Sequence, residues 1–246
     1  MFYFDEINGK RIVKSSVLAG LNHFFTTRES VIKTKEPDFE ELVAENKKDV
    51  CEYFGIDENN LIHPSQTHTS YVDVAKIGVS SYPDTDGLIL ANKEQAVYLN
   101  FADCTPVIIY DPVNKIAAVS HAGWRGTAGN IASKTVQKLA EEFGSKPENL
   151  KSAIGPAISF CCYNVGEEVY RELKKTVKDF SGLSEIRQGN IYVDLKGINK
   201  RQLIEAGMKP ENIDVCNFCT VCNNSLFFSY RKENATTNRH SAVVKL

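Results

Sequence analysis

The stretch TPVIIYDPVNKIAAVSHAGWRGTAGNI, residues 105–131, decides the fold class of this chain. Two apolar runs within it, Val107–Tyr110 and Ile116–Val119, flank a turn-forming segment at 111–114, which predicts a β-hairpin. The second run leads into a histidine and two glycines, and a helical pattern follows. Hairpins combined with helical crossovers are typical of a mixed sheet with helices packed on it, so the sequence predicts an α+β fold.

Short apolar runs and helical patterns continue on both sides of this stretch. No internal repeat or low-complexity linker interrupts them, and a length of 246 residues favours one domain, so we expect a single domain over residues 1–246. The expected strands are 12–18, 22–26, 71–75, 87–90, 96–101, 107–110, 116–119, 152–154, 191–193, 213–215, 226–230 and 242–244. The expected helices are 37–54, 130–143, 165–180 and 196–206.

Composition and charge exclude several classes of protein. The net charge of -2 implies no basic surface, so nucleic acid is not an expected partner. No apolar run reaches the roughly 18 residues that span a bilayer, and acids stand where a signal peptide would carry bases. We therefore expect a cytoplasmic protein without a membrane partner, and we expect it to be a monomer.

The seven cysteines do not suggest a disulfide framework, because their number is odd and the chain is not small. Cys216, Cys219 and Cys222 have the spacing of a metal motif, but iron-sulfur clusters and structural zinc generally take four ligands. Cys161 and Cys162 would have to complete such a site. We expect these cysteines to be buried as small apolar side chains instead.

Reactive side chains gather beside turn residues at the ends of predicted strands, in three stretches: 66–68, 100–106 and 121–127. His68, Cys104 and His121, one from each stretch, would make a catalytic zinc site with a fourth position left for water. Copper accepts the same ligands. The wide spacing is not a local signature, so a buried cysteine with two hydrogen-bonding histidines is the alternative.

Six strings of sequence around these residues resemble the laccase-domain family, which is also described as a multicopper polyphenol oxidase family and as a purine nucleoside phosphorylase family. Within them the ADC and HAGWRG motifs are specific, and their order and separation also fit. The strings are SQTH (65–68), NFADCTPVIIYDP (100–112), HAGWRGTAGNI (121–131), GPAISFCCYNVGEEV (155–169), VDLKGINKRQL (193–203) and CTVCNNSLFFSYRK (219–232).

The resemblance implies a single laccase-type domain whose metal ligands are His68, Cys104 and His121, the same three residues that the ligand chemistry selects. It implies zinc as the cofactor, with copper possible. It also implies an enzyme whose small-molecule partners are purine nucleosides and phosphate. Family members cleave adenosine, inosine and methylthioadenosine at the glycosidic bond, and they deaminate adenosine.

Deamination would use metal-activated water against C6 of the purine and a carboxylate that shuttles protons. We group Cys104, Asp103 and Arg125 as the expected catalytic residues. Asp103 neighbours Cys104 on an extended chain, where adjacent side chains point to opposite faces, so a positioning role is the alternative. Asp84 and Asp86 are further candidates for the shuttle, although turn formation would also explain them.

Phosphorolysis needs a phosphate held beside the ribose C1′. Arg28, Arg125 and Arg231 are the expected phosphate ligands, and surface ion pairing is the alternative for each. Trp124, the only tryptophan, is expected to stack on the purine, and core packing is its alternative. We therefore group Arg28, Arg231 and Trp124 as substrate-binding.

Two other functions stay open at this stage. A copper-dependent polyphenol oxidase ranks second, because a multicopper site needs more histidines than the five present. A non-enzymatic binding protein with a relic metal site ranks third, because all three ligands and their flanking motifs are intact.

Overall fold

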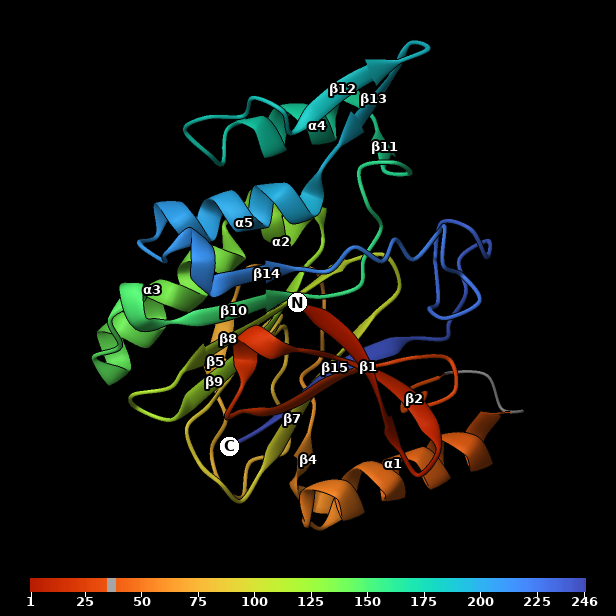
Figure 1. The fold of residues 1–246 in the computed structure, drawn as a ribbon, viewed down its shortest axis with the longest axis vertical. Helices are drawn as coiled ribbons and strands as arrows, with labels where there is room; N and C mark the ends of the chain where they lie inside the picture. Colours follow the sequence, from red (N-terminus) through yellow and green to blue (C-terminus); the bar gives the residue numbers. More distant parts are fainter. Residues whose placement is uncertain (35–38) are drawn as a thin grey trace.

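The computed structural model describes residues 1–34 and 39–246, whose strands and helices form four layers (Figure 1). Two six-stranded sheets pack face to face, and one core cluster contains side chains from both. Helix α1 (Glu40–Phe54) covers the outer face of the first sheet. Helices α3 (Ile131–Phe143) and α5 (Leu195–Glu205) cover the outer face of the second.

The first sheet is mixed. Its neighbours pair antiparallel except for the short β4, which runs parallel to β7. Its order is β1 (Phe2–Ile7), β2 (Lys10–Ser15), β3 (Asn22–Thr26), β15 (His240–Lys245), β7 (Ala96–Phe101) and β4 (Leu61–Ile62).

The second sheet is also mixed and contains the hairpin predicted from the sequence, in which Asp111 pairs with Ile116. Its two edge pairs are parallel and the others antiparallel. Its order is β14 (Ile213–Val215), β10 (Lys151–Ile154), β8 (Thr105–Asp111), β9 (Ile116–Ala122), β6 (Gly87–Leu90) and β5 (Val72–Val74).

A small three-stranded sheet lies beyond the helical layer, at the top of Figure 1. It consists of β11 (Asn164–Val165), β13 (Asn190–Val193) and β12 (Ser184–Arg187), and it lies beside α4 (Glu167–Lys174). In the part of the chain that the structure describes, the remaining helices are α2 (Trp124–Ala128) and the 3-10 turns η1 (Ser16–Leu18), η3 (Glu58–Asn60), η4 (Pro147–Asn149) and η5 (Pro210–Asn212).

Strand β8 shows why the sequences of the central strands are continuously apolar. Ile108 and Tyr110 point into the core between the sheets, whereas Val107 and Ile109 point toward the helices. Side chains alternate along a strand, so a strand covered on both faces must be apolar at every position. The same alternation continues into the residues that flank β8, and it places Cys104 against the core between the sheets.

The predicted α+β class with mixed sheets and packed helices is confirmed, although the strands form three sheets. The strand predicted at 226–230 is wrong, because turns occupy that segment. The buried Phe227 and Phe228 make it apolar, but their burial comes from tertiary packing. The helix predicted over 165–180 ends at Lys174. The start predicted for the first helix, at Pro37, lies outside the described residues.

Four strands of the described residues were not anticipated, and two of them, β4 and β11, have only two residues each. β1 exposes most of its side chains to solvent, and β12 is similarly open, so neither has the buried alternation that predicts a strand. Within residues 1–34 and 39–246, no helix combines the length and the apolar character needed to cross a membrane.

Candidate metal and substrate site

The three predicted metal ligands meet at one end of the second sheet. His68 lies in the loop between β4 and β5, Cys104 in the turn between β7 and β8, and His121 near the end of β9. Pairing of β8 with β9 places His121 opposite Pro106, two residues beyond Cys104. The ligand nitrogens and sulfur of the three residues all lie within 4.8 Å of one another. One ion can therefore contact all of them.

The charges in this group favour the metal-binding form of the thiol. Burial raises the pKa of Cys104, but the neighbouring His121 and His68 outweigh it and bring the pKa to about 6. Burial lowers the pKa of His121, whereas the Cys104 thiolate and Asp86 raise it to about 9. The thiolate is the form that binds metals, and a bound cation would displace the proton from Nε2 of His121.

Asp86 lies behind the ligand group and connects two of its members by hydrogen bonds. It is fully buried, and its carboxylate accepts a 2.7 Å hydrogen bond from Nδ1 of His121. The same carboxylate accepts from the backbone amides of Thr67, His68 and Thr69, at 3.1, 3.1 and 2.7 Å. Asp86 therefore orients His121 through its ring and His68 through its backbone, and it leaves Nε2 of His121 available for a metal ion.

This arrangement gives Asp86 a different role from the one considered for it in the sequence. A proton shuttle must reach the substrate, but Asp86 lies behind His121 and all its hydrogen bonds go to protein groups. It is a positioning residue. Its neighbour Asp84 accepts a hydrogen bond from the Thr67 hydroxyl at 3.1 Å, as a turn-forming residue would.

The backbone at the ligand group is unusual in its conformation at two positions and in its close approach to the ligands at a third. His68 and Asp103 have φ values of 64° and 81°, in the left-handed region that side chains other than glycine rarely occupy. Gly123 approaches the ligands so closely that a Cβ there would lie 3.0 Å from Sγ of Cys104 and 3.3 Å from Cδ2 of His68. Such strain is concentrated at functional sites in proteins.

A cavity of about 960 Å³ opens over the ligand group. This volume lies within the range of sites that bind small molecules, roughly 300 to 1,000 Å³. The ligands His68, Cys104 and His121 all contribute to its lining, as do aromatic rings and arginines on the surrounding loops. These surrounding residues include Trp124, Arg125, Ile158, Tyr163, Tyr230, Arg231 and Arg239.

Trp124 and Arg125 enter the cavity from helix α2, whose first turn follows Gly123. The Arg125 guanidinium lies 4.1 Å from the centre of the Trp124 ring. The tryptophan also packs against the core cluster beneath α4 and α5. The Trp124 ring therefore packs against the core and also lines the cavity.

The other two predicted arginines differ in position. Arg231 lines the cavity, and its guanidinium donates a 2.6 Å hydrogen bond to Oδ1 of Asn164. Arg28 is not among the residues that line the cavity. Its guanidinium donates to the carbonyl of Asn224 at 2.6 Å, pairs with Glu233 at 2.5 Å and lies over an aromatic ring. The structure therefore gives Arg28 the alternative role, that of a structural ion pair.

Arg239 is a cavity residue that the sequence did not indicate. It is half-buried, and its guanidinium donates to the backbone carbonyls of Thr236 and Asn238 at 2.5 and 2.7 Å. Burial lowers its pKa, and the nearby Cys104 and Asp103 oppose this effect. Its position directly before β15 is the feature that would have indicated it, because the other ligands also flank strand ends.

Asp103 lines the cavity and also connects its loops. Its carboxylate accepts from the Thr220 hydroxyl at 2.6 Å and from the backbone amide of Arg231 at 2.7 Å. Its own carbonyl accepts from the amide of Ile158 at 3.0 Å. These contacts favour the positioning alternative over proton transfer.

The remaining histidines do not join the ligand group. His23 and His240 are buried on strands, and burial lowers their pKa values to about 4 and about 3, so both are neutral. His63 lines the cavity. Among the described residues, none of these three histidines joins the ligand group.

The expectation that the cysteines outside the site are buried is confirmed for some of them and wrong for others. Cys216 and Cys219 are buried, but Cys161 and Cys222 are exposed. Cys161, Cys162, Cys219 and Cys222 lie together, and Cys216 is not part of the group.

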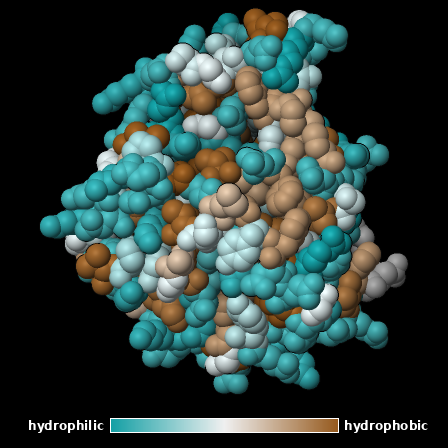
Figure 2. Space-filling view, viewed as in Figure 1, coloured by the Kyte–Doolittle hydropathy of each residue, from teal (hydrophilic) through white to brown (hydrophobic). Residues whose placement is uncertain are grey.

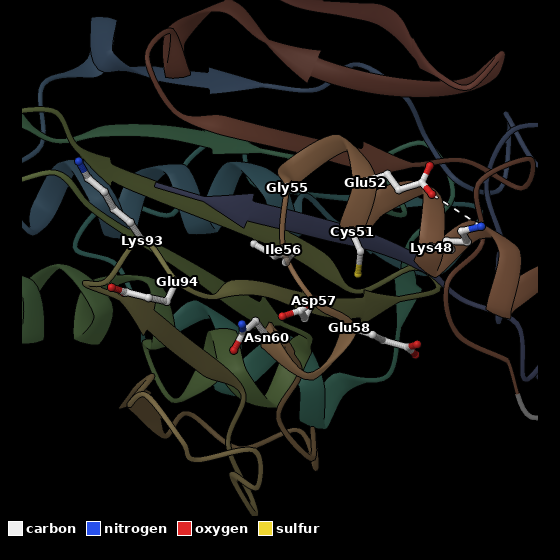
Figure 3. Close-up of a pocket in the computed structure, with 10 residues that line it drawn as sticks. All are labelled: Lys48, Cys51, Glu52, Gly55, Ile56, Asp57, Glu58, Asn60, Lys93 and Glu94. Atoms are coloured by element: carbon white, nitrogen blue, oxygen red, sulfur yellow. Dashed lines mark ion pairs between the residues drawn. The ribbon is translucent and has the colours of Figure 1, made fainter.

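A second hollow lies between the end of α1 and the loop before β7 (Figure 3). It has a volume of about 570 Å³. Its side chains are spread along the rim in Figure 3, where Lys48 pairs with Glu52 at 3.7 Å. It contains no group of metal-ligating residues among those described. The cavity over the ligand group is therefore the better candidate for a functional site.

Comparisons with known proteins agree with this geometry. A sequence profile of the family described as "Multi-copper polyphenol oxidoreductase laccase" matches residues 23–246. Purine nucleoside phosphorylase YlmD of Bacillus subtilis is 32% identical over 213 residues, covering 82% of this chain and 76% of its own. A protein named adenosine deaminase RL5, from an unknown prokaryotic organism, is 31% identical and covers 75% of this chain and 74% of its own.

Solved structures show the same fold. A hypothetical protein YfiH of Bacillus licheniformis superimposes with a TM-score of 0.91 at 28% identity, covering 99% of this chain and 98% of its own. YlmD of Geobacillus stearothermophilus superimposes with a TM-score of 0.89 at 28% identity, covering 98% of each chain.

Proposed function

Because the chain belongs to the multi-copper polyphenol oxidoreductase laccase family, we propose that it is a metal-dependent purine nucleoside phosphorylase that also deaminates adenosine. The substrates proposed are adenosine, inosine and methylthioadenosine. Relatives named purine nucleoside phosphorylase and adenosine deaminase support this proposal. The observation that carries it is a ligand group for one cation at the base of a cavity whose walls contain arginines and aromatic rings.

The donor set fits a zinc ion. One thiolate and two imidazoles are ligands that zinc prefers, and His68, Cys104 and His121 would hold it. The hydrogen bond to Asp86 fixes His121 with Nε2 available for the ion. Bound zinc would supply a Lewis acid and would lower the pKa of water to about 7.

The cavity walls fit the rest of a nucleoside and a phosphate. Arg125, Arg231 and Arg239 present cations that would hold the phosphate, and Trp124 and Tyr163 present rings against which a purine would pack. In phosphorolysis a phosphate oxygen forms a bond to C1′ while the glycosidic bond breaks and its electron pair passes to the purine nitrogen. The arginines would position the attacking phosphate and would stabilise its charge.

Oxidation of phenols by copper is the second candidate, and the description of the family profile favours it. A multicopper centre needs several clusters of histidines. The chain has five histidines, and the described residues combine two of them in a ligand group. Nucleoside chemistry therefore ranks first.

The decisive experiment incubates purified protein with adenosine and separates the products by chromatography. With phosphate we expect adenine and ribose 1-phosphate, and without phosphate we expect inosine. The Cys104→Ala variant, purified in the same way, controls for contaminating enzymes. Oxygen uptake with a phenol, together with no turnover of any of the three nucleosides, would instead establish the oxidase.

A further inference from the structure

We propose that Cys161, Cys162, Cys219 and Cys222 bind one zinc ion at a second site, separate from the cavity. Their four sulfur atoms all lie within 4.8 Å of one another. Two distant segments supply them, one between β10 and β11 and one after β14. No residue of this thiol group lines the cavity.

The two segments lie side by side in the fold. Ala157 forms a parallel bridge with Cys219, and the amide of Thr220 donates to the carbonyl of Ala157 at 3.1 Å. Figure 1 shows the segments running past each other beside β11. Figure 2 shows a band of moderately hydrophobic residues on the face that Figure 1 presents. Cys161 and Cys222 are exposed to solvent.

The distances between sulfur atoms distinguish a metal site from a disulfide. Sγ of Cys222 lies 3.7 Å from Sγ of Cys161 and 3.5 Å from Sγ of Cys162. A disulfide needs about 2.05 Å. Four sulfurs arranged tetrahedrally at about 2.3 Å from one zinc ion lie about 3.8 Å apart, close to the separations observed.

The chemistry of the donors selects the ion. Four thiolates form the tetrahedral, closed site typical of structural zinc, and Cys219 and Cys222 have the C-x-x-C spacing common in such sites. Calcium and magnesium prefer oxygen ligands. A four-iron cluster occupies the space between its thiolates, which must then stand further apart than the ligands of one ion.

Neighbouring groups are placed to support a negatively charged centre, since four thiolates around a divalent ion carry a net charge of two minus. The amide of Ser159 points at Sγ of Cys219, at 3.4 Å. The buried side chain of Lys196 donates to the carbonyls of Cys216 and Phe218, at 2.7 and 3.2 Å. The Lys196 ammonium group therefore lies beside residues 216–218, directly before Cys219, and stabilises that part of the second segment.

The ion would fix one wall of the cavity. Ile158 and Tyr163, which flank the first pair of cysteines, line the cavity. Thr220, between the second pair, donates to the carboxylate of Asp103. A zinc ion joining the two segments would hold these contacts in place without taking part in the chemistry.

Metal content tests the proposal. We expect the purified protein, expressed with zinc in the medium, to contain about two zinc ions per chain by elemental analysis. Cys222→Ser and Cys104→Ala should each retain about one, and the double variant none. Cys216→Ala is the matched control, because Cys216 belongs to the same sequence motif but not to the thiol group, and it should retain both ions.

Two results would overturn the proposal. One is a zinc content that Cys222→Ser does not change. The other is an intact mass lower by two hydrogens than that of the reduced chain, which would show a disulfide in place of the metal. Failure of the proposed nucleoside chemistry would leave this test unaffected, because the two ions are removed by different variants.

The absorption spectrum of bound cobalt provides a second readout, which begins with the native protein. Replacing zinc with cobalt in the native protein should give intense sulfur-to-metal absorption that Cys104→Ala largely keeps. Cys222→His should keep the ion and shift the spectrum, since imidazole also binds zinc-type ions. A spectrum that disappears with Cys104 alone would contradict a second site.

Discussion

The base of the cavity and its walls are built in different ways. His68, Cys104 and His121 form the base at the ends of strands in the central sheets, with the buried Asp86 behind them. The walls come from loops that are held to one another by hydrogen bonds, several of which involve Asp103. The base is therefore preorganised by the core, whereas the walls depend on contacts between loops.

This difference separates two kinds of mutational effect. Changes at the base should remove the metal and the reaction together while the fold survives, because the sheets do not need the ion. Changes in the walls should alter how substrates bind, and should leave the metal in place. Each of the four variants below tests this distinction.

Cys104→Ala should have the largest effect. Removal of a metal ligand should lower both phosphorolysis and deamination by more than about 100-fold, which exceeds the usual loss from a supporting residue. Zinc content should fall by one ion, while the melting temperature in a thermal unfolding experiment should change little. A large loss of melting temperature would show that the base depends on its ion as much as the walls do.

Asp86→Asn should come next. The amide keeps the shape of the side chain but carries no charge, so Nδ1 of His121 loses its carboxylate partner. Loss of such a partner typically reduces metal affinity or activity about 10- to 100-fold. Zinc affinity should be measured by competition with a chelator. Asp84→Asn is the control, and an equal loss in that variant would contradict the role given to Asp86.

Arg239→Gln tests the walls. Hydrogen bonds to charged groups contribute about 1.5 to 3 kcal/mol, or about 10- to 100-fold in affinity. Because Arg125 and Arg231 share the wall, we expect an increase of about tenfold in the KM for phosphate, with deamination and zinc content unchanged. The exposed Arg171, which pairs with Glu167 on α4, gives the control Arg171→Gln. If the Arg239→Gln variant loses deamination as strongly as phosphorolysis, Arg239 supports the metal site at the base of the cavity and not the phosphate.

Asp103→Asn should have the smallest effect. Its carboxylate joins the loops through Thr220 and Arg231, so weakening it should raise KM values a few-fold and change kcat little. The dependence of kcat on pH separates this role from catalysis. If Asp103 is a general base, its replacement should remove one pKa from the pH profile of kcat. If Asp103 is a positioning residue, the profile should keep its shape.

Most of the base could be predicted from the sequence, because its ligands are chemically distinctive and each follows or precedes an apolar strand. The sequence suggested Asp86 as a proton shuttle or as a turn-forming residue. Its role in positioning His121 depends on a contact between residues 35 apart, which the local sequence does not reveal. The walls could be predicted only in part. Arg125, Arg231 and Trp124 reach the cavity, but Arg28 pairs with Glu233. Arg239 was missed, and its position directly before a strand is the one sequence feature that points to it.

The sequence by itself determined the fold class and the hairpin of β8 and β9, because strand periodicity is a local property. It also selected His68, Cys104 and His121 as candidate ligands, from their donor chemistry together with the family resemblance of the motifs around them. The tertiary structure decided which residues meet across long separations. It assembled Cys161 and Cys162 with Cys219 and Cys222, and it turned Arg28 away from the cavity. Such contacts follow from the way loops pack on the sheets, and no local pattern of residues encodes that packing.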